Sequence, residues 1–113
     1  MIIGAKESPG LGALVLFGLG GIFVEVMKDV VVSLAPLSRP EARAMLRAVK
    51  GFPILQGLRG APGADLAALE DLLLRVSRLA ADFPAIAEMD LNPILVYPVG
   101  TPPAAVDVRL RVR

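Results

Sequence analysis

In the first third of the chain, short apolar runs are separated by turn residues, a pattern that predicts β-strands. Met1–Lys6 and Ala13–Phe17 are two such runs. Ile22–Met27 is rich in β-branched and aromatic residues, which favour a strand. A turn at Lys28-Asp29 then leads to Val30–Ala35. We therefore expect a meander of strands in this part of the chain.

The middle of the chain changes to the helical period. Ser38-Arg39-Pro40-Glu41 has the spacing of a capping box with a proline in the first turn, and Gly51 predicts the end of that helix. Asp65 caps a second helix that ends near Phe83-Pro84. The apolar positions of the first helix are Ala42, Met45, Leu46 and Val49, and those of the second are Leu66, Leu69, Leu72, Leu73, Val76, Leu79 and Ala80.

The last two predicted strands are Met89–Tyr97 and Ala104–Val112. Strands, then two helices, then strands indicate an α+β fold, a mostly antiparallel sheet with two helices packed on one face. The length of 113 residues fits a single domain with a modest core. The face of the sheet away from the helices is then expected to carry the polar residues, which are Glu25, Asp90, Asn92 and Asp107.

Asp90-Leu91-Asn92-Pro93 and Asp107 are the main candidates for chemistry. Strand alternation places Asp90 and Asn92 on one face, and a hairpin between Pro98 and Pro103 can bring Asp107 beside them. Two carboxylates and an amide oxygen suit a hard cation such as Mg²⁺, which shares its shell with water and phosphates. The alternative is a capped strand end, because Asn-Pro often starts a turn.

Composition removes many other functions. The chain has no Cys and no His, which excludes thiol nucleophiles, imidazole bases, disulfides and the usual zinc ligands. A net charge of +1, one Tyr, four Phe and no Trp argue against a nucleic-acid partner. The lack of cysteine fits a cytoplasmic location.

Three further features each have two interpretations. The Gly18-Leu19-Gly20-Gly21 loop can approach phosphate closely or be a plain tight turn, and it lacks the spacing of known phosphate loops. Glu25, inside a predicted strand, either faces solvent or needs a partner or a wet cleft. Arg59 is either a phosphate ligand or a solvated loop residue.

A membrane span is the weaker interpretation of the uncharged stretch between Glu7 and Glu25. Its length approaches that of a transmembrane helix. However, five glycines and Pro9 interrupt it, so we expect buried strands and no membrane partner.

The ordered motifs resemble the end of the ATP-grasp domain in nucleoside-diphosphate-forming acyl-CoA synthetases. This group includes the ADP-forming acetate–CoA ligases and is related to the succinyl-CoA synthetase β subunit. The resemblance covers practically the whole chain. It is carried by residues 17–29, by 34–37, by Gly57-Leu58-Arg59-Gly60, by Glu88-Met89-Asp90-Leu91-Asn92-Pro93-Ile94-Leu95-Val96 and by Ala105-Val106-Asp107-Val108-Arg109.

The resemblance implies specific roles for these residues. Asn92 and Asp107 match the magnesium pair, and Asp90 matches an acid that orients the phosphorylated histidine of a swinging loop. Gly20, Gly21 and Glu25 are the expected nucleotide-binding residues. The cofactors would be Mg²⁺ and ATP or ADP. The reaction would convert acyl-CoA, ADP and phosphate reversibly to acid, CoA and ATP.

The chain also departs from the family pattern. Ser8-Pro9 and Leu11-Gly12-Ala13 replace Asp-Pro and Phe-Gly-Pro, and the first ATP-grasp subdomain and the phosphohistidine have no counterpart in residues 1–113. We therefore expect the C-terminal subdomain of the fold, inactive alone. Its partners would be the remaining ATP-grasp half and a CoA-binding, phosphohistidine-bearing subunit or domain, and an isolated chain would tend to form a homodimer. The alternatives are a non-catalytic fragment or a regulatory or assembly module, and, more weakly, a membrane-associated protein.

Overall fold

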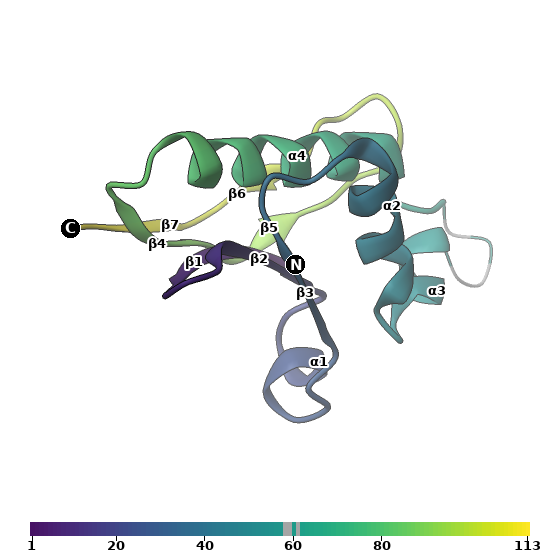
Figure 1. Cartoon of the computed structure of the whole chain (residues 1–113). Helices are drawn as coiled ribbons and strands as arrows, with labels where there is room; N and C mark the ends of the chain where they lie inside the picture. The colour runs from purple at the N-terminus through teal and green to yellow at the C-terminus, as the bar shows by residue number, and fades with distance from the viewer. Residues whose placement is uncertain (58–59, 61) are drawn as a thin grey trace.

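The computed structural model describes residues 1–57, 60 and 62–113 (Figure 1). A meander of strands opens the chain, a helical segment follows, and further strands close it. The elements in chain order are β1 (Ile2–Ser8), β2 (Gly12–Gly18), α1 (Ile22–Glu25), β3 (Val30–Leu34), α2 (Arg39–Ala48), α3 (Phe52–Gln56), α4 (Leu66–Asp82), β4 (Ile86–Leu91), β5 (Ile94–Leu95), β6 (Ala104–Ala105) and β7 (Val108–Val112).

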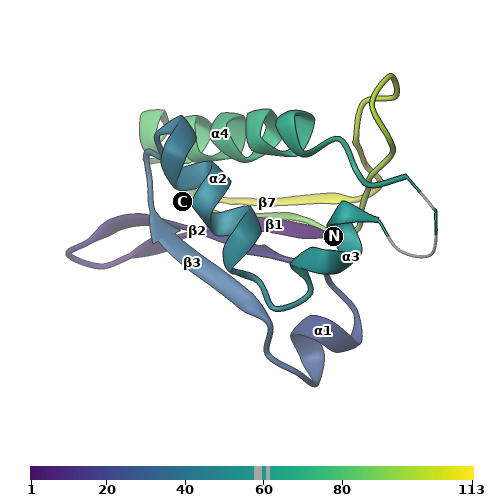
Figure 2. The ribbon, with the colours of Figure 1, turned by 90° about the vertical axis from the view of Figure 1, so that its right-hand side faces the viewer.

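The strands form an antiparallel sheet in the order β3-β2-β1-β4-β7, and β5 pairs with β6 separately. Helices α2 and α4 lie on one face of the five-stranded sheet, and the other face is left open (Figures 1 and 2). The predicted α+β architecture is therefore confirmed. In the part of the chain that the structure describes, no helix is long and apolar enough to cross a bilayer.

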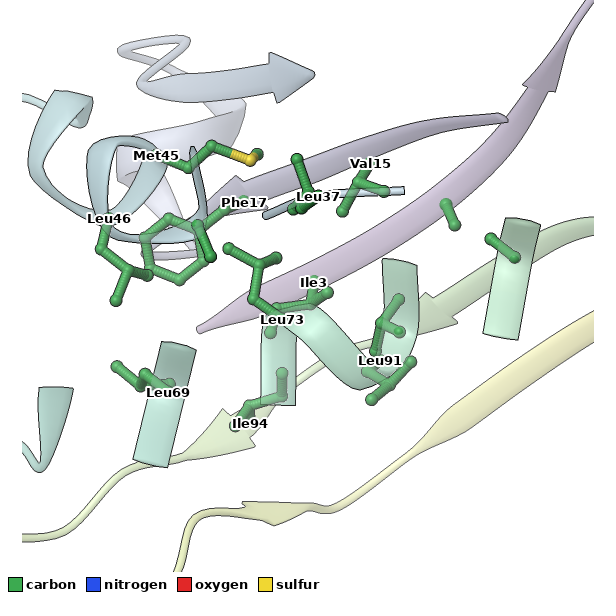
Figure 3. Close-up of a cluster of buried hydrophobic side chains, with 14 of the residues drawn as sticks. Ile3, Val15, Phe17, Leu37, Met45, Leu46, Leu69, Leu73, Leu91 and Ile94 are labelled. Carbon is green, nitrogen blue, oxygen red and sulfur yellow. The ribbon is translucent and has the colours of Figure 1, made fainter. Parts of the chain in front are cut away.

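The core lies between this sheet and its two covering helices (Figure 3). Alternate residues of β1 and β2 face the helices, so Ile3 and Phe17 are paired in register and fully buried. Leu46 of α2 and Leu73 of α4 close over them. Each such side chain contributes about 1.5–3 kcal/mol through burial, which fixes which face of the sheet stays open.

Both long helices begin at the predicted caps. The Ser38 hydroxyl accepts from the Glu41 amide at 3.3 Å and the Ser38 amide donates to the Glu41 carboxylate at 3.0 Å, which forms a complete capping box. The Asp65 carboxylate accepts from the Ala68 amide at 3.1 Å. The predicted apolar stripes are buried or partly buried, except for Leu79, which is 40% exposed.

The predicted strand Ile22–Met27 is wrong, because its first four residues form the short helix α1. Gly20 and Gly21 both have positive φ and turn the chain, after which the Gly21 carbonyl accepts from the Glu25 amide at 2.9 Å. The edges of β2 are already taken by β1 and β3, so no edge of that strand is left for Ile22–Met27. Tertiary pairing thus overrides the β propensity of these side chains.

Two other boundaries differ from prediction. Met89–Tyr97 is not one strand, because β4 ends at Leu91 and Pro93 cannot donate to the ladder. Ala104–Val112 is likewise split into β6 and β7. The first long helix ends at Ala48, before Gly51, and Pro53 lies in the first turn of α3.

Candidate metal and nucleotide site

One end of the sheet gathers most of the predicted functional residues. β2 ends at Gly18, β4 ends at Leu91 and β7 begins at Val108, and the strand register places all three at the same end. The glycine loop follows Gly18, and Asn92 and Asp107 extend β4 and β7. The lateral distance from β2 to β4 is about 10 Å, two strand spacings. Segments far apart in sequence therefore meet here.

Asn92 and Asp107 lie on neighbouring strands and are joined through the backbone. The Asn92 amide donates to the Asp107 carbonyl at 3.1 Å, continuing the β4–β7 ladder by one residue. Both residues are exposed. Residues paired in this way have Cα atoms about 4.5–5.5 Å apart and side chains on one face. The predicted pairing of Asn92 with Asp107 therefore has the required backbone geometry.

Asp90 lies one row further along the same open face. It is half-buried, pairs in register with Gly4 of β1 and with Arg109 of β7, and lines a shallow pocket. Gly4 has no side chain, so Asp90 is not covered from β1. The open face of these strands is charged, and the residues that line the pocket are Glu88, Asp90, Arg109, Leu110 and Arg111.

The glycine loop lies at the same end of the sheet as Asn92 and Asp107, whereas Glu25 is not in the strand that the sequence predicted. A Cβ on Gly20 would lie 3.9 Å from the Met1 backbone, so this loop runs beside the start of β1. Glu25 is exposed on α1, which projects from the end of β2 and β3 away from α4 (Figures 1 and 2). The prediction that Glu25 is a strand residue beside Asp90 is therefore wrong, because it lies on α1, on the side of the sheet that α4 does not cover.

Asp29 is a residue whose role the sequence interpretation missed. It is 5% exposed, and its two carboxylate oxygens accept from the Lys50 amide at 2.6 Å and the Gly51 amide at 2.8 Å. It therefore ties the start of β3 to the connection between α2 and α3. A lone acid between apolar runs was the only signal in the sequence. Arg59, the other loop candidate, lies outside the described residues.

The donor set fits a magnesium ion that completes its shell elsewhere. Among the described residues, no group of three or more His, Cys, Asp or Glu side chains could hold a metal ion. Asn92 and Asp107 instead offer one amide oxygen and one carboxylate, both open to solvent. Mg²⁺ commonly binds through one or two carboxylates and keeps waters and substrate phosphates as its other ligands. Such a pair suits a metal that arrives with a nucleotide.

Comparison with known proteins identifies the family of the chain. Residues 1–112 match the ATP-grasp domain. The chain is 50% identical over 110 residues to the acetate–CoA ligase (ADP-forming) I of Archaeoglobus fulgidus, covering 97% of this chain and 16% of the ligase. It is 47% identical over 111 residues to the β subunit of the acetate–CoA ligase (ADP-forming) II of Pyrococcus furiosus, covering 97% of this chain and 47% of that subunit.

A solved structure extends the similarity to the fold. It is the Ca. Korarchaeum cryptofilum dinucleotide-forming acetyl-coenzyme A synthetase 1 in complex with coenzyme A and Mg-AMPPCP, with its phosphohistidine segment pointing towards the nucleotide-binding site. The TM-score is 0.92 at 43% identity, covering 99% of this chain and 52% of that chain. The chain thus spans about half or less of the length of the relatives that it matches. It belongs to the ATP-grasp family, and over almost its whole length it is similar to part of ADP-forming acetate–CoA ligases.

Proposed function

We propose that this chain is the magnesium- and phosphate-binding half of the ATP-grasp domain of an ADP-forming acid–CoA ligase. The observation that carries the proposal is the position of Asn92 and Asp107, adjacent on the open face at the sheet end where the glycine loop lies. The complete reaction would convert acyl-CoA, ADP and phosphate to acid, CoA and ATP. The residues named here would supply only part of its nucleotide site.

Each residue at this end of the sheet would have a separate role. Asn92 and Asp107 would hold the metal, which neutralises phosphate charge and aligns the phosphoryl group for transfer. Asp90, one row further along the open face, would orient the histidine of a partner subunit or domain. Gly20 and Gly21 would let the backbone approach a phosphate. Glu25, on α1, would contact the nucleotide from outside the sheet.

The departures from the family pattern lie at the far end of the sheet. Ser8 pairs with Gly12 in the hairpin that joins β1 to β2. Six residues of strand separate that row from the Ile2–Gly18 row, a distance of about 20 Å. The substitutions at positions 8–13 are therefore remote from Asn92 and Asp107. This separation favours the catalytic proposal over a decayed or regulatory module.

Activity of the complete enzyme tests the proposal. The chain would be joined to, or coexpressed with, its upstream half and its phosphohistidine partner, and ATP formation from acetyl-CoA, ADP and phosphate would be followed. Asp107→Ala and Asn92→Ala should each lower kcat/KM at least about 100-fold, because metal ligation supplies several kcal/mol of charge stabilisation. Asp82→Asn, an exposed carboxylate on α4, is the matched control. Normal activity in both site variants would refute the assignment.

A further inference from the structure

Arg109 lies in the middle of three cross-strand pairs on the open face, which are Glu88 with Arg111, Asp90 with Arg109, and Asn92 with Asp107. It lies on β7 opposite Asp90 of β4 and two residues after Asp107. Residues two apart on a strand point to the same face, so the guanidinium shares that face with both carboxylates. The side chain is 81% exposed, and its Nε lies 3.5 Å from Asp107 Oδ2.

This ion pair is looser than its neighbour one row along. Arg111 donates a hydrogen bond to Glu88 at 3.2 Å, whereas the contact between Arg109 and Asp107 lies at the limit of hydrogen-bond distance. An exposed pair of this kind is worth little, because water and salt screen both charges. Separating Arg109 from Asp107 therefore costs little.

The Asp107 carboxylate faces Arg109 in this structure and, under the proposed function, would also face a metal ion. A divalent cation bound to the Asp107 carboxylate would compete with the Arg109 guanidinium for that carboxylate and weaken the ion pair between them. The released guanidinium presents a planar fork of donors, the geometry that pairs with two phosphate oxygens. Metal binding by Asp107 and phosphate binding by Arg109 would thereby be linked.

We infer that Arg109 is a phosphate-binding residue coupled to the metal site. It pairs with Asp107 when the metal is absent and donates to a phosphoryl group, of nucleotide or of free phosphate, when Asp107 holds the metal. The inference rests on the proposed function. Because Arg109 competes with the metal for Asp107 but donates to phosphate, removing it raises the affinity for the metal alone and lowers the affinity for phosphate.

The test uses the complete enzyme with Arg109→Met and Arg109→Lys. Binding of Mn²⁺ alone is followed by the EPR signal of the free ion, binding of ADP with Mn²⁺ by calorimetry, and the KM for phosphate by ATP formation. Arg109→Met should bind Mn²⁺ alone about two- to fivefold more tightly, because a competing cation is gone. It should bind ADP or phosphate about tenfold or more weakly, because a charge-assisted hydrogen bond is lost. Arg109→Lys should restore part of the phosphate affinity.

Two control variants are compared with Arg109→Met. Arg111→Met removes the same charge from the same strand and face, one row further from Asp107, and should shift each constant less than twofold. Asp107→Asn should weaken Mn²⁺ binding whether or not Arg109 binds phosphate. Tighter binding of Mn²⁺ alone, together with a higher dissociation constant for ADP or a higher KM for phosphate, supports the inference. The constant that rises shows whether Arg109 contacts a phosphate of the nucleotide or free phosphate.

Three results would overturn it. Unchanged constants in Arg109→Met, with weakened Mn²⁺ binding in Asp107→Asn, would reject the role of Arg109 and leave the proposed function standing. If Arg109→Met and Arg111→Met changed the Mn²⁺, ADP and phosphate affinities equally, Arg109 would contribute only general positive charge and would have no specific role. Normal Mn²⁺ and nucleotide binding in Asp107→Asn would reject the proposed function and the inference together.

Discussion

At the scale of single residues, Asp29 is the buried acid that links the strands to the helical segment. Replacing it with Ala leaves the Lys50 and Gly51 amides without their acceptor, and the Gly51 amide is buried. We expect Asp29→Ala to lower the free energy of unfolding by about 2–3 kcal/mol. Chemical denaturation monitored by circular dichroism measures this loss. Asp71→Ala, which removes an exposed partner of Arg39, is the control and should cost at most about 1 kcal/mol. Equal losses in the two variants would contradict this role of Asp29.

Sequence patterns predicted local residue roles better than distant ones. The capping role of Ser38 depends on Glu41, three residues away, and the sequence indicated it correctly. Asp29 accepts from amides 21 and 22 residues away, and no local spacing shows such a contact. The same limit applies to Arg109, since its neighbour Asp90 comes from another strand.

At the scale of elements, the capping box makes the stability of α2 depend on pH. Hydrogen bonds from the Ser38 amide and hydroxyl lower the pKa of the Glu41 carboxyl below its usual value. A lowered pKa in the folded state stabilises the fold above the unfolded-state pKa, and this contribution is lost as pH falls through the folded-state pKa. Wild type should therefore have a higher Tm than Glu41→Gln near pH 7, with the difference shrinking as the pH falls through the acid range. A Tm difference that is the same at pH 7 and in acid would contradict this.

The elements that were predicted correctly are those whose boundaries the local sequence sets. Helix α4 has a capping residue, a long apolar stripe and a proline beyond its end, and these signals agree. Ile22–Met27 has β-branched residues, but both edges of the preceding strand β2 are paired with β1 and β3, and the segment starts as a helix after Gly21. A β-strand needs a pairing partner, and Val30–Leu34 forms the strand that pairs with β2 on this side.

At the scale of the whole molecule, apolar residues are exposed on α1 and on the open face of β3, the edge of the sheet opposite β7. Val32 and Leu34 of β3 lie on the open face and are 50% and 46% exposed, and Ile22 and Val26 of α1 are also exposed. Exposed apolar surface of this kind typically marks an interface. We expect the isolated chain to self-associate, and the upstream half of the domain to compete for this surface.

Sedimentation velocity of the isolated chain measures this association. Val32→Thr with Leu34→Thr should shift the distribution towards monomer and change Tm little, because threonine is β-branched and is favoured at exposed strand positions. Leu79→Ser, an exposed apolar residue on α4, is the control for lost apolar surface elsewhere. A wild-type chain that is monomeric at all concentrations would contradict the expectation.

The arrangement of the sheet explains why the candidate site was only partly predictable. Asn92 and Asp107 are joined by a short connection, so alternation and a hairpin sufficed to bring them together. The place of the glycine loop at the same sheet end depends on the pairing of β1 with β4, which joins the first strand to one about 85 residues later. The resemblance assigned the loop and the Asn92–Asp107 pair to nucleotide and magnesium binding, and the strand register shows that both lie at one end of the sheet.

The most direct test of the central claim is the position of the metal in a crystal of the complete protein with Mn²⁺ and ADP. Anomalous scattering should place one Mn²⁺ at coordination distance, about 2.1 Å, from oxygen atoms of both Asn92 and Asp107, with a phosphate oxygen in the same shell. A metal bound with nucleotide elsewhere in the crystal, with neither Asn92 nor Asp107 in its shell, would contradict the account.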